Sequence, residues 1–362
     1  MSTTNFALVP SINPGDALAA APDTAPLKAL AALAASATAH GAAALWLRDS
    51  LALRAGENAA PGLDAGLLAS ALGPLTAGLG LIAQAPSGVA EPFHTATALQ
   101  TADHASLGRA GLALAPAFDD EQHSAQGRWP AQERTVAALI QDADDTLEAI
   151  ARLWESWEPD AAIRDAVSGR FLDRDRIHPA NFTGARFSIE GASITPRSPQ
   201  GRPPVFIEAG TPALARLAAD RADVAVVPLG DGADGEREAV ATLASLSGRP
   251  EQAWVGVRLT AQADLPALAQ SLERLRAAGF SGAVLHLSPE AHTPQLLAQT
   301  LAALAAVPHG AGEGASEASG EGEHAASGTR NPRTAGPTLR SILGLPEAHN
   351  PHTLARKEAL NV

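Results

Sequence analysis

Short apolar runs alternate with longer amphipathic stretches along most of this 362-residue chain, and this rhythm limits the possible fold more than any other feature. Each short run has the length of a buried strand and is bounded by turn residues, whereas the stretches between runs repeat apolar residues at three- and four-residue spacing. Such alternation predicts an α/β fold built from strand–helix units around a parallel sheet. Eight strands are predicted, at residues 6–12, 43–49, 79–84, 110–115, 204–209, 223–229, 253–259 and 282–287.

Eight strand–helix units joined by right-handed crossovers close most simply into a (β/α)8 TIM barrel. An open, doubly wound sheet uses the same units, and periodicity alone leaves that alternative open. The longest amphipathic stretch, residues 130–157, predicts a helix that begins at Pro130 and carries Glu133 in its first turn.

Two segments interrupt the rhythm and divide the chain. Residues 159–203 are polar and rich in turn residues, so they predict an insertion before strand five, with a hairpin at 185–190 and a position over one mouth of the barrel. Residues 309–336 are dominated by Gly, Ser, Glu and Ala, a composition that predicts a disordered linker. The barrel is therefore predicted to span residues 1–308, with a C-terminal tail, residues 337–362, docking back onto it.

Composition excludes several kinds of chemistry. The chain has no Cys and no Tyr, which removes disulfides, thiolate nucleophiles, iron–sulfur clusters, cysteine zinc sites and phenolic acids or bases. A net charge of -13 argues against nucleic acid as a partner. The scattered His residues predict no metal site, and neither a secretory signal nor a membrane span is predicted, so we expect a cytoplasmic protein.

Barrel enzymes build their active sites from the loops that follow the strands, and this rule selects the candidate residues. Gly210 and Thr211 end one strand and precede Pro212, so they could hold a phosphate at a helix N-terminus or form an ordinary N-cap. Asp49 could likewise serve the site or cap a helix. The full set of candidates is Asp49 and Ser50, residues 84–87, Pro116, Gly210 and Thr211, residues 228–231, His286 and Ser288.

Several segments, taken in order, resemble the bacterial luciferase-like flavin monooxygenases, in the branch that contains nitrilotriacetate and dibenzothiophene-sulfone monooxygenases. They are Leu-Trp-Leu-Arg-Asp-Ser at 45–50, Glu-Pro-Phe-His at 91–94, Asp-His-Ala-Ser-Leu-Gly-Arg at 103–109, residues 153–158, 184–191 and 197–203, and the tail at 338–346.

This resemblance implies a TIM barrel that binds FMN, which a separate NAD(P)H-dependent flavin reductase supplies in reduced form. The reduced flavin and O2 would oxygenate a small organic substrate. The resemblance also implies a homodimer, or pairing with a homologous barrel, through helices beside the early strands. Related barrels use a deazaflavin instead, so that cofactor is an alternative.

The chain departs from the family pattern where polar flavin contacts are expected, which predicts a degraded flavin site. Strand three ends in Gln-Ala-Pro-Ser at 84–87 in place of Thr-x-Ser-Thr, and strand four lacks the Trp-Asn pair and the hydroxyl pair that follows it. Asp49, Ser87, Gly210 and Thr211 remain as predicted flavin contacts, with no predicted acid or base. Replacement donors could come from Gln84, Arg109, Arg128 or His286, whereas Trp154 and Trp157 are interpreted as packing residues. A non-catalytic homologue or silent subunit is the alternative function.

Overall fold

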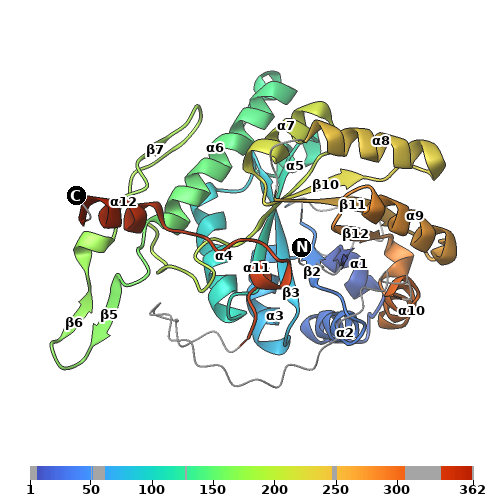
Figure 1. Ribbon diagram of the computed structural model, residues 1–362, viewed down its shortest axis with the longest axis horizontal. Coiled ribbons are helices and arrows are strands. Elements are labelled where there is room, and N and C mark those ends of the chain that lie inside the picture. Colours follow the sequence, from blue (N-terminus) through green and yellow to red (C-terminus); the bar gives the residue numbers. More distant parts are fainter. Residues whose placement is uncertain are drawn as a thin grey trace.

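A closed barrel of eight parallel strands forms the body of the molecule (Figure 1). The computed structural model describes residues 6–49, 51, 62–126, 129–246, 251–305 and 336–360. Every predicted strand is present, and because the sheet closes on itself the open-sheet alternative is wrong. Around the barrel the strands follow chain order: β1 Ala7–Ile12, β2 Ala44–Leu47, β3 Gly80–Ser87, β4 Ala110–Pro116, β9 Val205–Glu208, β10 Val224–Pro228, β11 Gln252–Leu259 and β12 Gly282–Leu287.

Side chains alternate between the inside and the outside of the barrel, as the strand period of two requires. Inside, the Phe206 ring packs tilted against Trp46 and edge to face against Trp254, with ring centroids 5.9 and 5.7 Å apart. Val9, Ile82, Ala113, Val226 and Val284 complete the same buried cluster. Alternate residues, including Leu45, Leu81 and Leu285, join a second cluster beneath the helices. The barrel interior is therefore a filled core rather than a pore.

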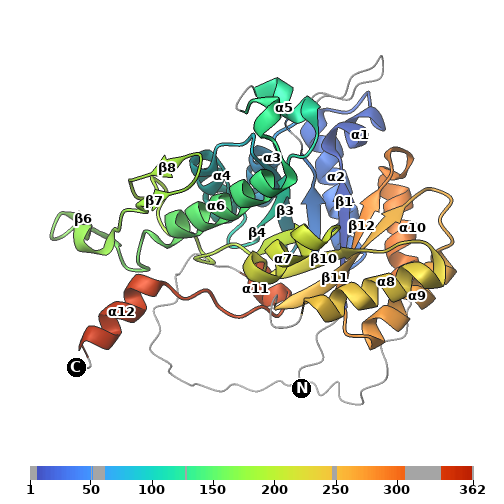
Figure 2. The same cartoon turned by 90° about the horizontal axis from the view of Figure 1, so that it is seen from above.

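Helices surround the barrel, and their polar ends are capped locally (Figure 2). Helix α6 begins at Val136 rather than at the predicted Pro130, because Thr135 caps the backbone N–H of Ala138 and Pro130 precedes a separate 3-10 turn. The helices before the tail are α1 Pro14–Ala19, α2 Pro26–Ala39, α3 Ala65–Leu72, α4 Pro92–Ala105, α5 Asp120–Gln126, α6 Val136–Glu155, α7 Pro212–Arg221, α8 Gly232–Ser245, α9 Leu265–Ala277 and α10 Pro294–Ala305.

The insertion before β9 forms two small hairpins, one of which is the predicted hairpin near residues 185–190. Strands β5 Ala162–Asp165 and β6 Arg170–Leu172 make the first, and β7 Phe182–Thr183 and β8 Ser188–Ile189 make the second. The β7–β8 hairpin lies beside α6, and the β5–β6 hairpin extends outward near α12 (Figure 1). Neither hairpin covers a mouth of the barrel, so that expectation is wrong (Figures 1 and 2).

Hydrogen bonds to α4 account for this lateral position of the insertion. Trp157 Nε1 donates to Ser193 O at 2.7 Å, and Ser193 Oγ donates to Gln100 Oε1 of α4 at 2.6 Å. Ser193 and Gln100 are both buried. Since buried polar groups are costly to leave unpaired, these bonds fix the insertion against the α4 side of the barrel.

The amino ends of the strands are closed by the C-terminal segment, in which Leu339, Leu343 and Leu345 join the interior cluster. A Cβ at Gly80 would lie 2.5 Å from Leu339 Cδ1, so glycine provides the space that the leucine occupies. Helix α11, Leu339–Ile342, carries this contact, and α12, Pro351–Leu360, continues beyond it to the insertion. The predicted linker lies outside the described residues except for Gly336, and the domain boundaries stay predictions.

Asp103 connects α4, the insertion and the C-terminal segment at this same end. Its carboxylate accepts hydrogen bonds from Ala110 N, from Gln200 N and from Gln200 Nε2. Gln200 Oε1 in turn accepts from Arg340 N at 2.9 Å. Burial raises the pKa of Asp103, while these hydrogen bonds oppose the shift. The motif that starts at Asp103 therefore has a structural role at the amino end of the barrel. It does not contribute to the loop-rich carboxyl end.

No helix within the described ranges is both long and apolar enough to cross a membrane.

Replacing Leu339 by Ala should destabilise the barrel, because a fully buried leucine at the amino end would leave a cavity. We expect the free energy of unfolding to fall by about 2–5 kcal/mol. Leu67→Ala on α3 is the matched control, since that side chain is 61% exposed, and it should change stability by less than about 0.5 kcal/mol. Urea unfolding followed by circular dichroism measures both; equal effects would contradict the role of Leu339.

Candidate active site at the carboxyl ends of the strands

A polar layer replaces the apolar one where the strands end. Arg48 lies directly after β2, two residues beyond Trp46, while Glu208 follows Phe206 on β9 and His286 follows Val284 on β12 in the same way. Because alternate residues of a strand share a face, these side chains continue the inward-facing rows. Ser11 and Gln84 occupy the equivalent places beyond Val9 and Ile82. These five rows therefore change from apolar to polar at the carboxyl end of the barrel.

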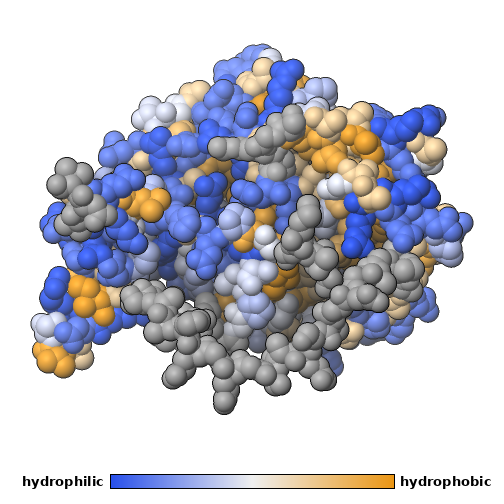
Figure 3. Space-filling model, viewed as in Figure 1, coloured by the Kyte–Doolittle hydropathy of each residue, from blue (hydrophilic) through white to orange (hydrophobic). Residues whose placement is uncertain are grey.

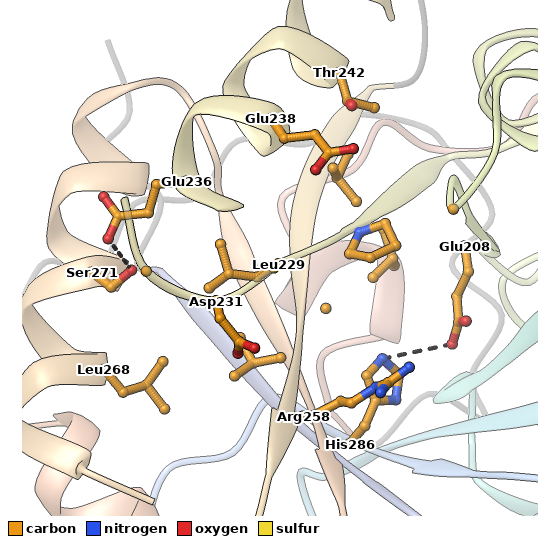
Figure 4. A pocket seen from close by; sticks show the side chains of 18 of the residues that line it. Glu208, Leu229, Asp231, Glu236, Glu238, Thr242, Arg258, Leu268, Ser271 and His286 are labelled. Carbon is orange, nitrogen blue, oxygen red and sulfur yellow. Dashed lines mark hydrogen bonds and ion pairs between the residues drawn. The ribbon is translucent and has the colours of Figure 1, made fainter. Parts of the chain in front are cut away.

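A cavity of about 1050 Å³ opens over this layer and extends between α8 and α9 (Figure 4). That volume is at the upper end of the usual range for ligand sites. Arg48 also lines a neighbouring cavity of about 270 Å³, together with Asn13, Asp49 and Gln84. The large cavity has apolar walls from Ala209, Val226, Val257 and Leu268, and the charged or polar side chains that line it are Arg48, Glu208, Asp231, Glu236, Glu238, Thr242, Arg258, Asp264, Ser271, Arg274 and His286.

Helix α8 leaves this side of the barrel thinly covered. Within α8 the buried residues are Gly235 and Ala239, which have small side chains. Apolar side chains gather on the surface over α7 and α8 in Figure 3, among charged ones. Val240 of α8 is one of the large apolar residues exposed to solvent. The thin cover explains why the cavity reaches outward between α8 and α9.

Arg48, Glu208 and His286 form a close group at the base of the cavity. Arg48 Nη1 lies 2.8 Å from His286 Nδ1, and since the guanidinium can only donate, Nδ1 is the acceptor. The neutral imidazole therefore carries its proton on Nε2, which faces Glu208 Oε1 at 3.6 Å. Arg48 Nη1 lies 3.7 Å from the same oxygen. Figure 4 shows Glu208 and His286 pointing toward one another.

Burial lowers the pKa of His286 to about 4, with Arg48 and Arg258 adding to the shift and Glu208 opposing it. Gly256 makes room for the ring, because a Cβ there would lie 3.1 Å from His286 Nε2. Two oxygens of the polar layer, Ser11 Oγ and Glu208 Oε1, are buried without a hydrogen-bond partner among the described residues. The layer thus offers a neutral imidazole, two guanidinium groups and an unsatisfied carboxylate oxygen.

The four residues predicted to contact flavin occupy different environments. Asp49 lies at the mouth, but its carboxylate accepts from Leu51 N at 2.8 Å and from Ala65 N at 3.0 Å. Thr211 caps α7, accepting from Leu214 N through Oγ1 at 3.2 Å. Their side-chain oxygens therefore already serve the local backbone.

Gly210 and Ser87 differ from that pair. Gly210 lines the large cavity. Ser87 is buried, has the strand parity of Leu81 and Ala83 in the outer cluster, and does not line either cavity at the mouth. Its position in the strand therefore places it on the helix side of β3 and not among the inward rows.

Of the proposed replacement donors, Gln84 and His286 lie at the mouth. Gln84 Nε2 donates to Asp49 O, and its Oε1 accepts from Trp46 Nε1. Arg109 lies at the opposite end, where it donates to Leu79 O and Gly73 O. Arg128 lies outside the described residues.

Trp154 and Trp157 are packing residues, as interpreted from the sequence. Both rings are buried, and their Nε1 atoms donate to backbone carbonyls of Ala96 and Ser193.

Within the described part of the chain, no group of three or more His, Asp or Glu side chains is arranged to hold a metal ion.

Sequence reasoning missed Arg48, Glu208 and Arg258 as site residues. It searched the loops after the strands, whereas these three lie within or directly after the strands themselves. The available signal was a charged residue two positions after a large buried one, as in Trp46–Arg48 and Phe206–Glu208. This parity rule would have identified the inward-facing charges.

The chain belongs to the luciferase-like monooxygenase family, whose model matches residues 5–299. The family assignment agrees with the barrel and with the cavity at its carboxyl end.

Among characterised relatives, the chain is 35% identical over 184 residues to N-acetyl-S-(2-succino)cysteine monooxygenase of Bacillus subtilis (strain 168), covering 50% of this chain and 41% of the relative. It is 32% identical over 178 residues to nitrilotriacetate monooxygenase component A of Aminobacter aminovorans, covering 47% and 37%. Dibenzothiophene-sulfone monooxygenase of Rhodococcus erythropolis is 31% identical over 155 residues, covering 43% and 34%. The matched regions thus span less than half the length of these relatives.

Solved structures share the fold at low sequence identity. EDTA monooxygenase from Chelativorans sp. BNC1 superimposes with a TM-score of 0.67 at 16% identity, covering 95% of this chain and 99% of that one. A riboflavin lyase, solved with modified FMN and riboflavin, gives a TM-score of 0.59 at 21% identity, covering 74% and 66%.

His286 should stay neutral from pH 8 down to about pH 5, because its pKa is lowered to about 4. Arg48→Met should raise this pKa by removing a cation, and Glu208→Gln should lower it by removing the opposing carboxylate. The measurement is an NMR pH titration of the imidazole Cε1–H signals, with the His286 signal assigned by its loss in His286→Asn. A His286 signal that titrates near pH 6.5 would contradict the buried, neutral ring.

The same shift makes stability depend on pH. Between the ordinary pKa of about 6.5 and the folded value of about 4, the unfolded chain binds more protons at this residue. His286 therefore contributes a loss of stability as pH falls through that window. His286→Asn should show a shallower decline over the same range in urea unfolding.

Proposed function

We propose that this protein is an FMN-dependent, two-component monooxygenase that acts on a small organic substrate at the carboxyl end of its barrel. The observation that carries the proposal is the polar layer of Arg48, Glu208 and His286 beneath a cavity of about 1050 Å³, in a chain of the luciferase-like monooxygenase family. The fold neighbour solved with modified FMN supports a flavin as the cofactor.

The lining residues are compatible with a flavin. Pro228, Leu229 and Val257 offer apolar surface to a planar ring, while Arg48 and Glu208 offer a donor and an acceptor to its polar edge. Gly210, at the turn before α7, is the candidate neighbour of the phosphate. The start of α8 is less suitable for an anion, because Asp231 and Asp234 place negative charge there.

Bound in reduced form, the flavin would supply the electrons that activate O2. The chain's own residues would hold the ring and exclude water from the reacting atoms. Leu229, Val257 and Leu268 form the part of the wall that excludes water. His286 is neutral and carries its proton on Nε2, so it offers an N–H group to a bound molecule without needing to transfer a proton.

The proposed partners are a separate NAD(P)H-dependent flavin reductase and a second barrel. The chain contains no cysteine that could form a redox-active dithiol, so we expect reducing equivalents to arrive with the cofactor. We place a homodimer, or a pair with a homologous barrel, at the Ala-rich helix α2 beside the early strands, where Leu27 is exposed.

A second candidate function is a non-catalytic homologue or silent subunit. The observation that favours it is that Asp49 and Thr211, two of the predicted flavin contacts, already accept hydrogen bonds from backbone N–H groups. In that case the cavity would hold flavin weakly and the chain would act through its partner.

Anaerobic titration with reduced FMN separates the two candidates. We expect saturable binding in the micromolar range, and tighter than for oxidised FMN, because Arg48 and Arg258 favour the extra negative charge of the reduced ring. Arg48→Met should weaken binding by roughly tenfold or more, since hydrogen bonds to charged groups contribute about 1.5–3 kcal/mol. The control is Arg276→Met on α9, which does not line the cavity.

Isothermal calorimetry provides the affinities, and oxygen uptake with an added flavin reductase and candidate substrates tests turnover. Absence of binding at millimolar reduced FMN would reject the monooxygenase proposal and favour the non-catalytic alternative.

A further inference from the structure

We infer that Glu208, with Arg48 beside it, recognises the imide edge of the flavin ring, where an N–H group lies between two carbonyl oxygens. In this arrangement the Glu208 carboxylate accepts the ring N3–H and the Arg48 guanidinium donates to an adjacent carbonyl. The inference rests on the proposed function and assigns specific residues to it.

One carboxylate oxygen of Glu208 can still accept a hydrogen bond from a ligand. Oε1 is buried and has no hydrogen-bond partner among the described residues. Its nearest charged or polar neighbours, Arg48 Nη1 at 3.7 Å and His286 Nε2 at 3.6 Å, are attracted to it but lie beyond hydrogen-bonding distance. A buried carboxylate oxygen without a donor costs free energy, so the geometry leaves a place for a donor from a ligand.

The guanidinium groups near Glu208 favour a neutral hydrogen-bond donor over a cationic one on the ligand. The Arg48 guanidinium lies 3.7 Å from Glu208 Oε1, and Arg258 lines the same cavity, whose remaining acidic residues are Asp231, Glu236, Glu238 and Asp264. His286 adds no charge near neutral pH. An ammonium group placed here would be repelled by both arginines. An amide or imide N–H satisfies Glu208 Oε1 without that repulsion.

Arg48 is held beside Glu208 and still has guanidinium N–H groups available to donate to a ligand. His286 Nδ1 accepts from Nη1, and within the described chain this is the hydrogen bond that Arg48 donates. A guanidinium has five N–H donors in a planar fork, so others can meet a carbonyl next to the donor that Glu208 accepts. A neighbouring donor and acceptor on the protein complement a neighbouring carbonyl and N–H on the ligand.

The packed barrel interior gives the Arg48 and Glu208 side chains a rigid support. Arg48 and Glu208 stand two residues beyond Trp46 and Phe206, whose rings pack at 5.9 Å inside the barrel. Around the closed barrel β3 and β4 lie between β2 and β9, and the continuous strand pairing holds such residues in fixed register, which suits them to read a defined ring edge. A 5-deazaflavin presents the same imide edge, so this recognition by itself does not choose between the two cofactors.

Methylation of the ring N3 tests the inference, because it removes the N–H and leaves both carbonyls. The probes are reduced FMN and reduced 3-methyl-FMN, titrated anaerobically by calorimetry against the full-length wild-type chain. We expect methylation to weaken wild-type binding by about tenfold or more, the loss expected when a charged acceptor is left unpaired. In Glu208→Ala, the same methylation should change affinity by less than about threefold, as a double-mutant cycle requires.

Glu273→Ala is the matched control. This carboxylate is exposed on α9 and does not line the cavity, so its removal changes net charge equally and should preserve the wild-type methylation effect. Circular dichroism checks that each variant is folded. Should Glu208→Ala fail to fold, Glu208→Gln keeps the shape of the side chain and should still reduce the methylation effect below that of the wild type.

Each result decides the inference. Equal binding of FMN and 3-methyl-FMN by the wild type would overturn it and leave the proposed function standing. A full methylation effect in Glu208→Ala would also overturn it, since another group would then accept the N–H. Absence of FMN binding removes both proposals, unless 5-deaza-FMN binds with the same dependence on N3–H and Glu208; that outcome would support edge recognition and replace the cofactor.

Discussion

The alternation of side chains along eight closed parallel strands is the constraint on which the rest of this structure depends. Within a barrel each inward row must be filled, and here the rows are filled by Trp46, Phe206 and Trp254 with smaller residues between them. These rings occupy the middle of the barrel and leave no channel. The same rows then present Arg48, Glu208 and His286 at the carboxyl end, so one geometric rule positions both the core and the site.

The two ends of the barrel have separate tasks. At the amino end, Leu339 closes the core, while Asp103, Gln200 and Arg340 connect α4, the insertion and the C-terminal segment through buried hydrogen bonds. The residues of this end make up a large part of the sequence motifs that resemble the family. These motifs therefore indicate that the chain shares the scaffold of the family. The carboxyl end, by contrast, holds the cavity and carries the residues in which this chain departs from the family pattern.

Those departures change the interpretation of the site more than the interpretation of the fold. Expected polar contacts are replaced or already engaged, as the Asp49 carboxylate and the Thr211 hydroxyl show by accepting backbone N–H groups. The polar layer below the cavity offers charged groups in their place. A carboxylate oxygen that is itself buried beside arginine, as Glu208 Oε1 is, is a stronger hydrogen-bonding group than a hydroxyl, because charge assists the bond. A site that lacks the polar side chains expected from the family pattern can therefore still recognise a ligand specifically.

The sequence by itself determined the eight strands, the insertion before β9 and the family, because strand period, turn residues and motif order are local properties of the chain. It located the carboxyl-end loops but not the pairing of Arg48, directly after β2, with His286 on β12, which are separated by 238 positions. It also placed the insertion over a mouth, whereas contacts between Ser193 and Gln100 hold it beside α4. Only the tertiary structure decides such contacts, since barrel closure and burial bring distant residues together and fix which polar atoms remain unpaired.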